Sequence, residues 1–150
     1  MSLTYKQGRI VILLNGRFSG CKAVIVNNNY LSNKSPQENF ESIILLGIQR
    51  YPCNIIKKMN KTKIIQKSKI KIFLKSMNKN HFLPTRYNID FGEENSEKIK
   101  NFALDYLQKK NKFENEQKLN YKNQKNFIKN LLLERYLSNK NKWFFQKLKF

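Results

Sequence analysis

The most informative feature of this sequence is a long basic interval that contains no acidic side chain. The interval from Ser42 to Ile89 contains no Asp or Glu, and ten Lys or Arg residues fall between Cys53 and Asn88. Each cation that neutralises a phosphate releases counterions, so such a surface binds nucleic acid in a salt-dependent way. Lysine supplies a point charge, whereas bidentate reading of bases favours arginine. The pattern predicts recognition of a nucleic-acid backbone, and a solvated charged surface is the structural alternative.

A second candidate is the segment 80–87, which carries His81, Arg86 and Tyr87. Histidine and arginine can hydrogen-bond phosphate or a base edge, and an aromatic ring can stack on an unpaired base. The alternative is packing, with Pro84 setting a turn and the aromatic rings facing inward. His81 is the only histidine, and this segment offers no Ser, Cys or carboxylate to pair with it. We therefore expect no catalytic residue here.

The acidic residues and the cysteines give only weak evidence for a catalytic or metal site. Asp90, Glu93 and Glu94 form the one acidic cluster near the basic interval. They could bind Mg²⁺ in an RNA-modifying enzyme, or lie at an exposed helix N-terminus, where acids favour the helix dipole. Cys21 and Cys53 belong to no C-x-x-C motif or Cys/His cluster, and we expect two free thiols. Because there is no Cys/His cluster, we expect no metal site. Because no nucleotide-binding glycine motif occurs, we expect no cofactor.

Two glycines, Gly16 and Gly20, bound a five-residue turn between two apolar segments. Glycine at both ends of a turn indicates positive φ or close backbone approach. Arg17 and Lys22 lie in or beside this turn, where they could meet an RNA backbone. An ordinary hairpin turn is the structural alternative.

The first half of the chain has the pattern of short strands separated by turns, which is typical of a small barrel. In 69–75 the even positions are apolar and the odd positions are mostly Lys, with Phe73 as the exception. This alternation predicts one face toward a core and one toward solvent or phosphate. The segment 27–37 is polar and predicts a loop. The strands that we expect cover residues 9–14, 22–26, 42–48, 69–75 and 86–90.

The second half changes to helical periodicity. Apolar positions with i, i+3, i+4, i+7 and i+8 spacing predict an amphipathic helix. They are Ile99, Phe102, Ala103, Tyr106 and Leu107. The pattern returns at Phe127, Ile128, Leu131, Leu132 and Arg135. The segment 112–125 is weakly periodic, and we expect it to be helical only with support from a partner.

The last twelve residues alternate aromatic and lysine side chains. Trp143, Phe144 and Phe145 could be a buried anchor, or could pack into a groove of RNA and neighbouring proteins. The lysines available to phosphates are Lys140, Lys142, Lys147 and Lys149. A membrane-surface segment is a third interpretation, which no lipidation motif supports.

Length and charge limit the class of protein. The chain has 150 residues, with 30 Lys plus Arg against 10 Asp plus Glu and a net charge of +20. One domain with an appendage is expected at this length. A charge this large disfavours a compact isolated chain and is tolerated when a polyanion neutralises it. No apolar run has the length of a membrane span or of a signal peptide, so we expect an intracellular protein.

Several blocks resemble the family of the eukaryotic large-subunit ribosomal protein that is twenty-seventh in its series, unrelated to the bacterial protein of that number. Residues 8–26 look like the KOW motif of this family, and the basic aromatic ending 140–148 is close to its C-terminal signature. Further blocks that are similar to its signatures, in family order, are 47–52, 67–71 and 80–87.

The resemblance implies a mixed β+α protein with three segments. They are a small SH3-like KOW β-barrel with a basic insertion (1–91), a helical appendage (92–138) and a basic aromatic C-terminal tail (139–150). It implies a non-catalytic structural constituent of the cytosolic large ribosomal subunit, assembled in the nucleolus. Its partners would be large-subunit rRNA and neighbouring ribosomal proteins, with no membrane and no small-molecule substrate.

The resemblance also allocates residues. The rRNA contacts that we expect are Arg17, Lys22, Lys67, Lys69, Lys71, His81, Arg86, Lys140, Lys142 and Lys147. Gly16 and Gly20 would shape the turn, and Trp143, Phe144 and Phe145 would anchor the tail. The alternative function is a transient KOW-domain RNA-binding factor in transcription or ribosome assembly, which would leave particles at moderate salt.

Overall fold

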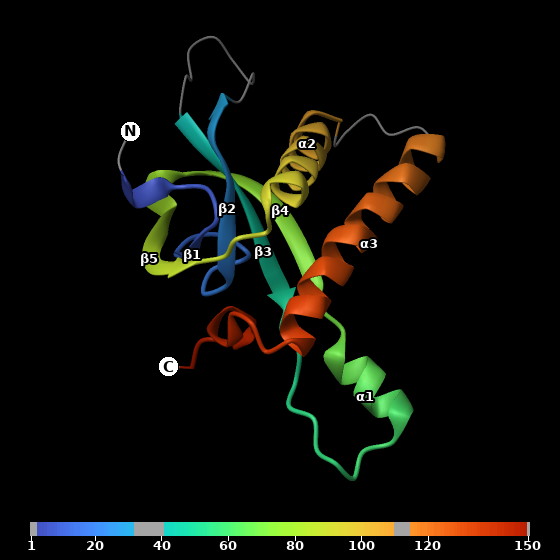
Figure 1. Ribbon diagram of the computed structural model, residues 1–150. Helices are drawn as coiled ribbons and strands as arrows, with labels where there is room; N and C mark the ends of the chain where they lie inside the picture. Colours follow the sequence, from blue (N-terminus) through green and yellow to red (C-terminus); the bar gives the residue numbers. More distant parts are fainter. Residues whose placement is uncertain (1–2, 32–40, 110–114, 150) are drawn as a thin grey trace.

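The computed structural model describes residues 3–31, 41–109 and 115–149 (Figure 1). Five antiparallel strands form one sheet in the order β4-β3-β2-β1-β5. The strands are β1 (Arg9–Leu13), β2 (Lys22–Leu31), β3 (Glu41–Arg50), β4 (Lys71–Asn78) and β5 (Phe82–Asn88). The α-helices are α1 (Lys61–Ser68), α2 (Glu93–Lys109) and α3 (Asn115–Leu137). Three short 3₁₀ helices are η1 (Leu3–Tyr5), η2 (Lys79–His81) and η3 (Lys142–Phe145).

This architecture confirms the mixed class, with a β-rich N-terminal region followed by helices. The sheet is not closed into a barrel: β4 and β5 are its two edges, and they are joined in sequence by η2. All five strands differ from their predicted bounds, and β2 and β5 differ most. β2 continues to Leu31, into the segment predicted as a polar loop, because β3 pairs with it as far as Glu41. β5 begins already at Phe82, which pairs with Leu13 of β1.

Both faces of the sheet are buried. Alternate residues of β1 and β2, such as Ile10 and Val24, face a core that α2, α3 and η3 cover. Their neighbours, such as Val11 and Ile25, face a second apolar cluster on the opposite side. The prediction of a polar odd-numbered face on β4 is therefore wrong at Phe73, which is 7% exposed. The physical reason is that a second core needs apolar residues at the intervening positions.

Phe73 is held by close packing in this second core. Its ring stacks on that of Phe18, with centroids 3.9 Å apart and planes at 4°. Gly47 lies directly across the β3–β4 ladder from Phe73. A β-carbon at Gly47 would stand 2.2 Å from the Phe73 ring, so only glycine leaves room for it. Gly47 thus leaves room for the Phe73 ring. The stack of Phe73 on Phe18 in turn packs the turn between β1 and β2 against the sheet.

The helices cover the sheet as their periodicity predicts. Ile99, Phe102 and Ala103 of α2 are buried, which confirms that helix face. In α3, Ile128 is buried, whereas Phe127 is 44% exposed and lies outside the core. The further buried residue of α3 is Leu132, and Leu131 is packed against the core.

The expectation that 112–125 needs a partner to become helical is wrong for residues 115–125. α3 begins at Asn115, and residues 112–114 lie outside the described residues. Aromatic packing between the two helices supplies the support. The Tyr121 ring lies 4.8 Å from Phe102 and 4.9 Å from Tyr106, measured between centroids. One core contains residues of all three predicted segments, 1–91, 92–138 and 139–150. The structure therefore does not separate these segments, and their boundaries stay a prediction.

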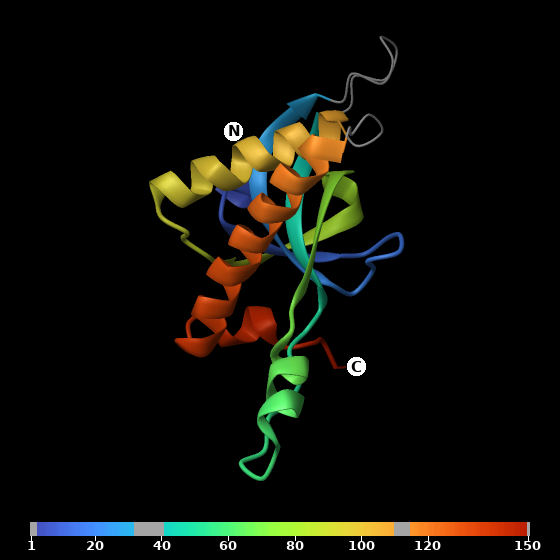
Figure 2. The same cartoon turned by 90° about the vertical axis from the view of Figure 1, so that its right-hand side faces the viewer.

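The segment 51–70, which we call the arm, leaves the sheet after β3 and returns to β4 (Figures 1 and 2). It contains α1 and projects away from the body of the protein, as both views show. No residue of α1 is buried, and Ile65 is 63% exposed. The sequence patterns did not predict this helix, because a short helix without a core-facing stripe has no clear periodicity.

Candidate nucleic-acid interface

The glycine turn between β1 and β2 has the predicted geometry. Gly16 and Gly20 have φ of +87° and +77°, which side chains with a β-carbon rarely adopt. The Gly20 amide donates to the Leu13 carbonyl at 2.8 Å, and Phe18 is buried in the second core. This fixed backbone leaves Arg17 exposed, with its guanidinium carbon 4.6 Å from the Phe18 ring centroid.

Lys22, which was expected to contact RNA, has a different role. Its side chain is 1% exposed, and its ammonium donates to the Trp143 carbonyl and to the Gln146 carbonyl, the latter at 2.6 Å. The ammonium also lies 3.9 Å from the Trp143 ring centroid. Burial lowers the pKa of Lys22 to about 8. The expected phosphate contact is wrong, because the cation is used to hold the tail on β2.

The described part of the tail, residues 139–149, folds back onto the body through two left-handed residues. Asn139 and Asn141 have φ of 56° and 54°, a region that asparagine tolerates better than most residues. The Asn141 side-chain amide donates to the Asn88 carbonyl at 3.3 Å. Phe144 and Phe145 are 1% and 3% exposed within the core of the protein. Phe144 and Phe145 therefore form a buried anchor within the protein, and they are not available to a groove of RNA or of neighbouring proteins.

Arg86 is tied to the tail by a chain of rings. Its guanidinium carbon lies 5.3 Å from the centroid of Tyr87, and the Tyr87 and Trp143 centroids are 4.7 Å apart. Arg86 itself is exposed. Phe82, in contrast, is 2% exposed, so it packs inward and is no stacking surface. The segment 80–87 thus supplies both core packing and an exposed cation.

His81 is exposed and connects η2 to the glycine turn. Its Nδ1 lies 3.0 Å from Nδ2 of Asn15, and the Leu14 amide donates to the His81 carbonyl at 2.9 Å. These two contacts place His81 beside the turn that carries Arg17. Arg17 also lines a second hollow with Lys75 and Lys125.

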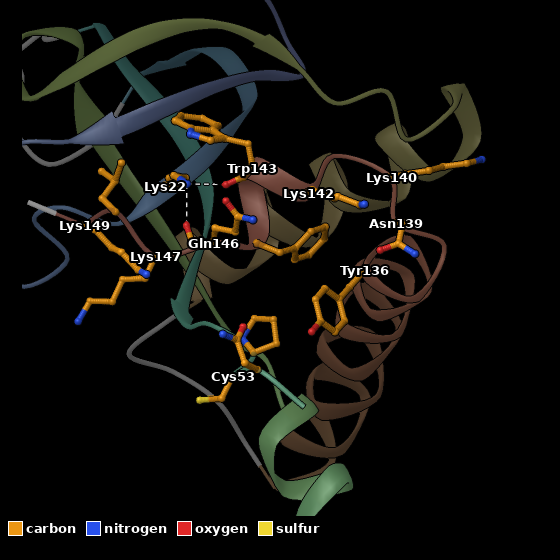
Figure 3. A pocket seen from close by; sticks show the side chains of 14 residues that line it. Lys22, Cys53, Tyr136, Asn139, Lys140, Lys142, Trp143, Gln146, Lys147 and Lys149 are labelled. Atoms are coloured by element: carbon orange, nitrogen blue, oxygen red, sulfur yellow. Dashed lines mark hydrogen bonds between the residues drawn. The ribbon is translucent and has the colours of Figure 1, made fainter. Parts of the chain in front are cut away.

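A basic cleft of about 840 Å³ lies between the tail, the end of α3 and the base of the arm (Figure 3). Lys140, Lys142, Lys147 and Lys149 line it and are exposed, and none of the residues lining it is acidic. We call it the tail cleft. Figure 3 places Tyr136 on its α3 side and Cys53 on its arm side. The arm side also contributes Pro52 and Asn54.

The base of the arm, which carries Lys67, is connected to the same cleft. Lys67 is half-buried, and its carbonyl accepts from the amide of the cleft residue Cys53 at 2.9 Å. Lys69 and Lys71 are exposed, and Lys71 pairs with Arg50 across the β3–β4 ladder. The base of the arm thus adjoins the tail cleft through this backbone contact. Arg17 and His81 lie together at the glycine turn.

Sequence reasoning missed Tyr136 and the residues 52–54 of the cleft. Of these residues only Pro52 lies in a block that resembles the family, and only the return of the tail past the arm brings them together. A half-buried tyrosine near the end of an amphipathic helix gives no signal that separates binding from packing. The lysines were found because charge density alone indicates them.

The acidic cluster lies at the start of α2. Glu93 and Glu94 are in the first turn of this helix, and Asp90 accepts a hydrogen bond from the Gly92 amide at 2.8 Å. In residues 3–31, 41–109 and 115–149, no three His, Cys, Asp or Glu side chains form a group able to hold a metal ion. Cys21 and Cys53 are free thiols, as predicted. No helix in the described part of the chain has the length and apolar character needed to cross a bilayer.

Comparison with known protein families gives a match over nearly the whole chain. The model of the Ribosomal L27e protein family matches residues 10–150. The matched range includes the glycine turn, the arm, α2, α3 and the tail. Every element of the interface described above therefore lies within the family match.

Proposed function

The chain belongs to the Ribosomal L27e family, and we propose that it binds large-subunit rRNA through the arm, the tail cleft and the glycine turn. It is a structural constituent of the large ribosomal subunit, and thus part of a ribonucleoprotein that acts in translation. The proposal concerns which of its residues meet RNA. No observation favours a transient factor in transcription or assembly.

The observation that carries this proposal is the exposure of cations on a region that has no acidic residue. The arm contributes lysines from both sides of α1, and the tail contributes four more around the cleft. Such a surface gains affinity through phosphate contacts and counterion release. The rRNA contacts that we propose are Arg17, Lys67, Lys69, Lys71, His81, Arg86, Lys140, Lys142 and Lys147. Lys22 is left out because its ammonium is already bound within the chain.

The proposal includes a non-catalytic role in the cytosolic ribosome after assembly in the nucleolus. Neighbouring ribosomal proteins are the second class of partner. Ile56 and Ile65 of the arm are 61% and 63% exposed, which supports burial of the arm inside a particle. Lysine predominates over arginine, so the contacts would read the position of the RNA backbone more than its base sequence.

Reversing two neighbouring charges, at Lys69 of the arm and Lys71 of β4, tests the proposal. We expect Lys69→Glu with Lys71→Glu to lower incorporation into large subunits roughly tenfold, because two cations become anions at a phosphate-binding surface. The isolated fold should be retained, since both side chains are exposed. Incorporation is measured by mass spectrometry of purified subunits from cells that express the tagged variant beside the wild type.

The matched control makes the same charge change elsewhere. Lys98→Glu with Lys100→Glu alters α2, which also carries Glu93 and Glu94 and lies outside the proposed contacts. We expect this variant to be incorporated much like the wild type. Equal incorporation of both variants would remove Lys69 and Lys71 from the contact residues.

A further inference from the structure

We propose that the tail cleft holds one unpaired nucleotide of its RNA partner, with the base beside Tyr136 and the phosphates on the surrounding lysines. This inference rests on the proposed function, because it assumes that RNA reaches the cleft. It goes further by assigning a single-stranded ligand to one site. Backbone contact alone would fit an RNA duplex equally well.

The size of the cleft favours a single nucleotide. Its volume of about 840 Å³ falls within the range of roughly 300–1,000 Å³ that is typical of sites for small molecules. A nucleotide that has left its stack fits such a space, whereas the double helix is far wider and could only touch the rim. Sequence-specific RNA-binding proteins use unpaired bases in this way, by stacking them on aromatic side chains.

The walls offer a separate group for each part of a nucleotide. Lys140, Lys142, Lys147 and Lys149 supply ammonium groups for phosphates. The side-chain amides of Asn54, Asn139 and Gln146 can donate to and accept from base edges. Among the described residues, none that lines the cleft has a carboxylate side chain that would repel an anion.

Tyr136 is the ring best placed to receive the base. Trp143 also lines the cleft, but its ring is already flanked by the Lys22 ammonium and by Tyr87. Tyr136 is half-buried and meets Phe145 at an interplanar angle of 59°, so Phe145 does not cover it as a parallel stack would. Figure 3 shows Tyr136 facing the space between the tail and the arm.

Both walls are held in place before any ligand arrives. The Lys22 ammonium binds two carbonyls of the tail, and the Cys53 amide binds the Lys67 carbonyl at the base of the arm. A site with fixed walls loses less conformational entropy on binding. The cleft is therefore a preformed receptor for a base.

Trp143 provides the measurement, because it is the only tryptophan and lies at the cleft. Its fluorescence in the purified full chain is titrated with single-stranded oligoadenylate and with an RNA duplex that has the same number of phosphates. We expect saturable quenching by oligoadenylate. Tyr136→Leu should weaken oligoadenylate binding about 5- to 150-fold, the range of one lost base stack. Duplex binding should change by less than about twofold.

The matched control is Tyr5→Leu, which removes another half-buried tyrosine, one that packs edge-to-face against Phe82 and does not line the tail cleft. This variant should bind both probes like the wild type, and it controls for loss of packing. Equal loss in both variants, no loss in Tyr136→Leu, or equal quenching by the duplex would overturn the inference. So would equal competition by oligoglutamate, which would reduce the cleft to an unspecific anion site. None of these results affects membership of the large subunit, which sedimentation tests independently.

Discussion

Phe144→Ala is expected to lower the free energy of unfolding by about 3–5 kcal/mol, the range for removing a buried phenylalanine ring. Phe144 is 1% exposed and lies in the core that joins the sheet to α2 and α3. Its ring also packs edge-to-face against Phe145, with centroids 5.3 Å apart. The change would leave a cavity under the tail. Urea unfolding of the purified full chain, followed by circular dichroism, measures the loss.

The control for this prediction is Phe127→Ala in α3. It removes the same ring from a side chain that is 44% exposed, and surface substitutions usually change stability by about 0.5 kcal/mol or less. We expect a clear separation between the two variants. Similar losses would show that the tail is not an integral part of the core.

Lys22→Met is expected to lower the free energy of unfolding by about 1–3 kcal/mol at pH 7. The methionine keeps an apolar stem, but the Trp143 and Gln146 carbonyls lose the ammonium that donates to them. A buried acceptor left without a donor costs about 1–3 kcal/mol. Lys147→Met, at an exposed lysine of the same cleft, should change stability little. The same unfolding measurement compares the two variants.

The pH dependence of stability distinguishes Lys22 from a lysine in solvent. Its pKa is lowered to about 8 in the folded chain, from 10.5 in the unfolded chain. Between these values the unfolded chain binds the proton that the folded chain has released, so this residue makes the free energy of unfolding rise with pH. The variant Lys22→Met should lose that part of the slope, and Lys147→Met should keep it. Identical slopes in all three proteins would contradict the burial of the Lys22 ammonium.

Local pattern predicted the elements whose partners lie close in sequence. β1 and the start of β2 follow from runs of β-branched residues on either side of a glycine turn. α2 follows from Ile99, Phe102 and Ala103, which share one helical face and are all buried. The positive φ of Gly16 and Gly20 also follows from residue type and position. In each case a short window of sequence contains the physical cause.

The errors concern residues whose surroundings come from distant parts of the chain. Lys22 resembles an RNA contact in sequence, but its partner carbonyls lie 121 and 124 residues later. Phe73 is buried only because the sheet has a core on each face. Tyr136 gains a role only when the tail returns past the arm. No local pattern contains these contacts, so charge and periodicity misplace Lys22 and Phe73 and do not detect the cleft.

The most direct test of the account is sedimentation of a cell lysate through low-salt and high-salt gradients, with this chain followed by mass spectrometry. A structural constituent anchored by the arm and the tail should track the large subunit one-to-one and survive the high-salt wash. Phosphate contacts that are buried within a particle are screened by salt much less than exposed ones. Recovery at the top of the gradient, or release at moderate salt, would contradict an integral role in the subunit.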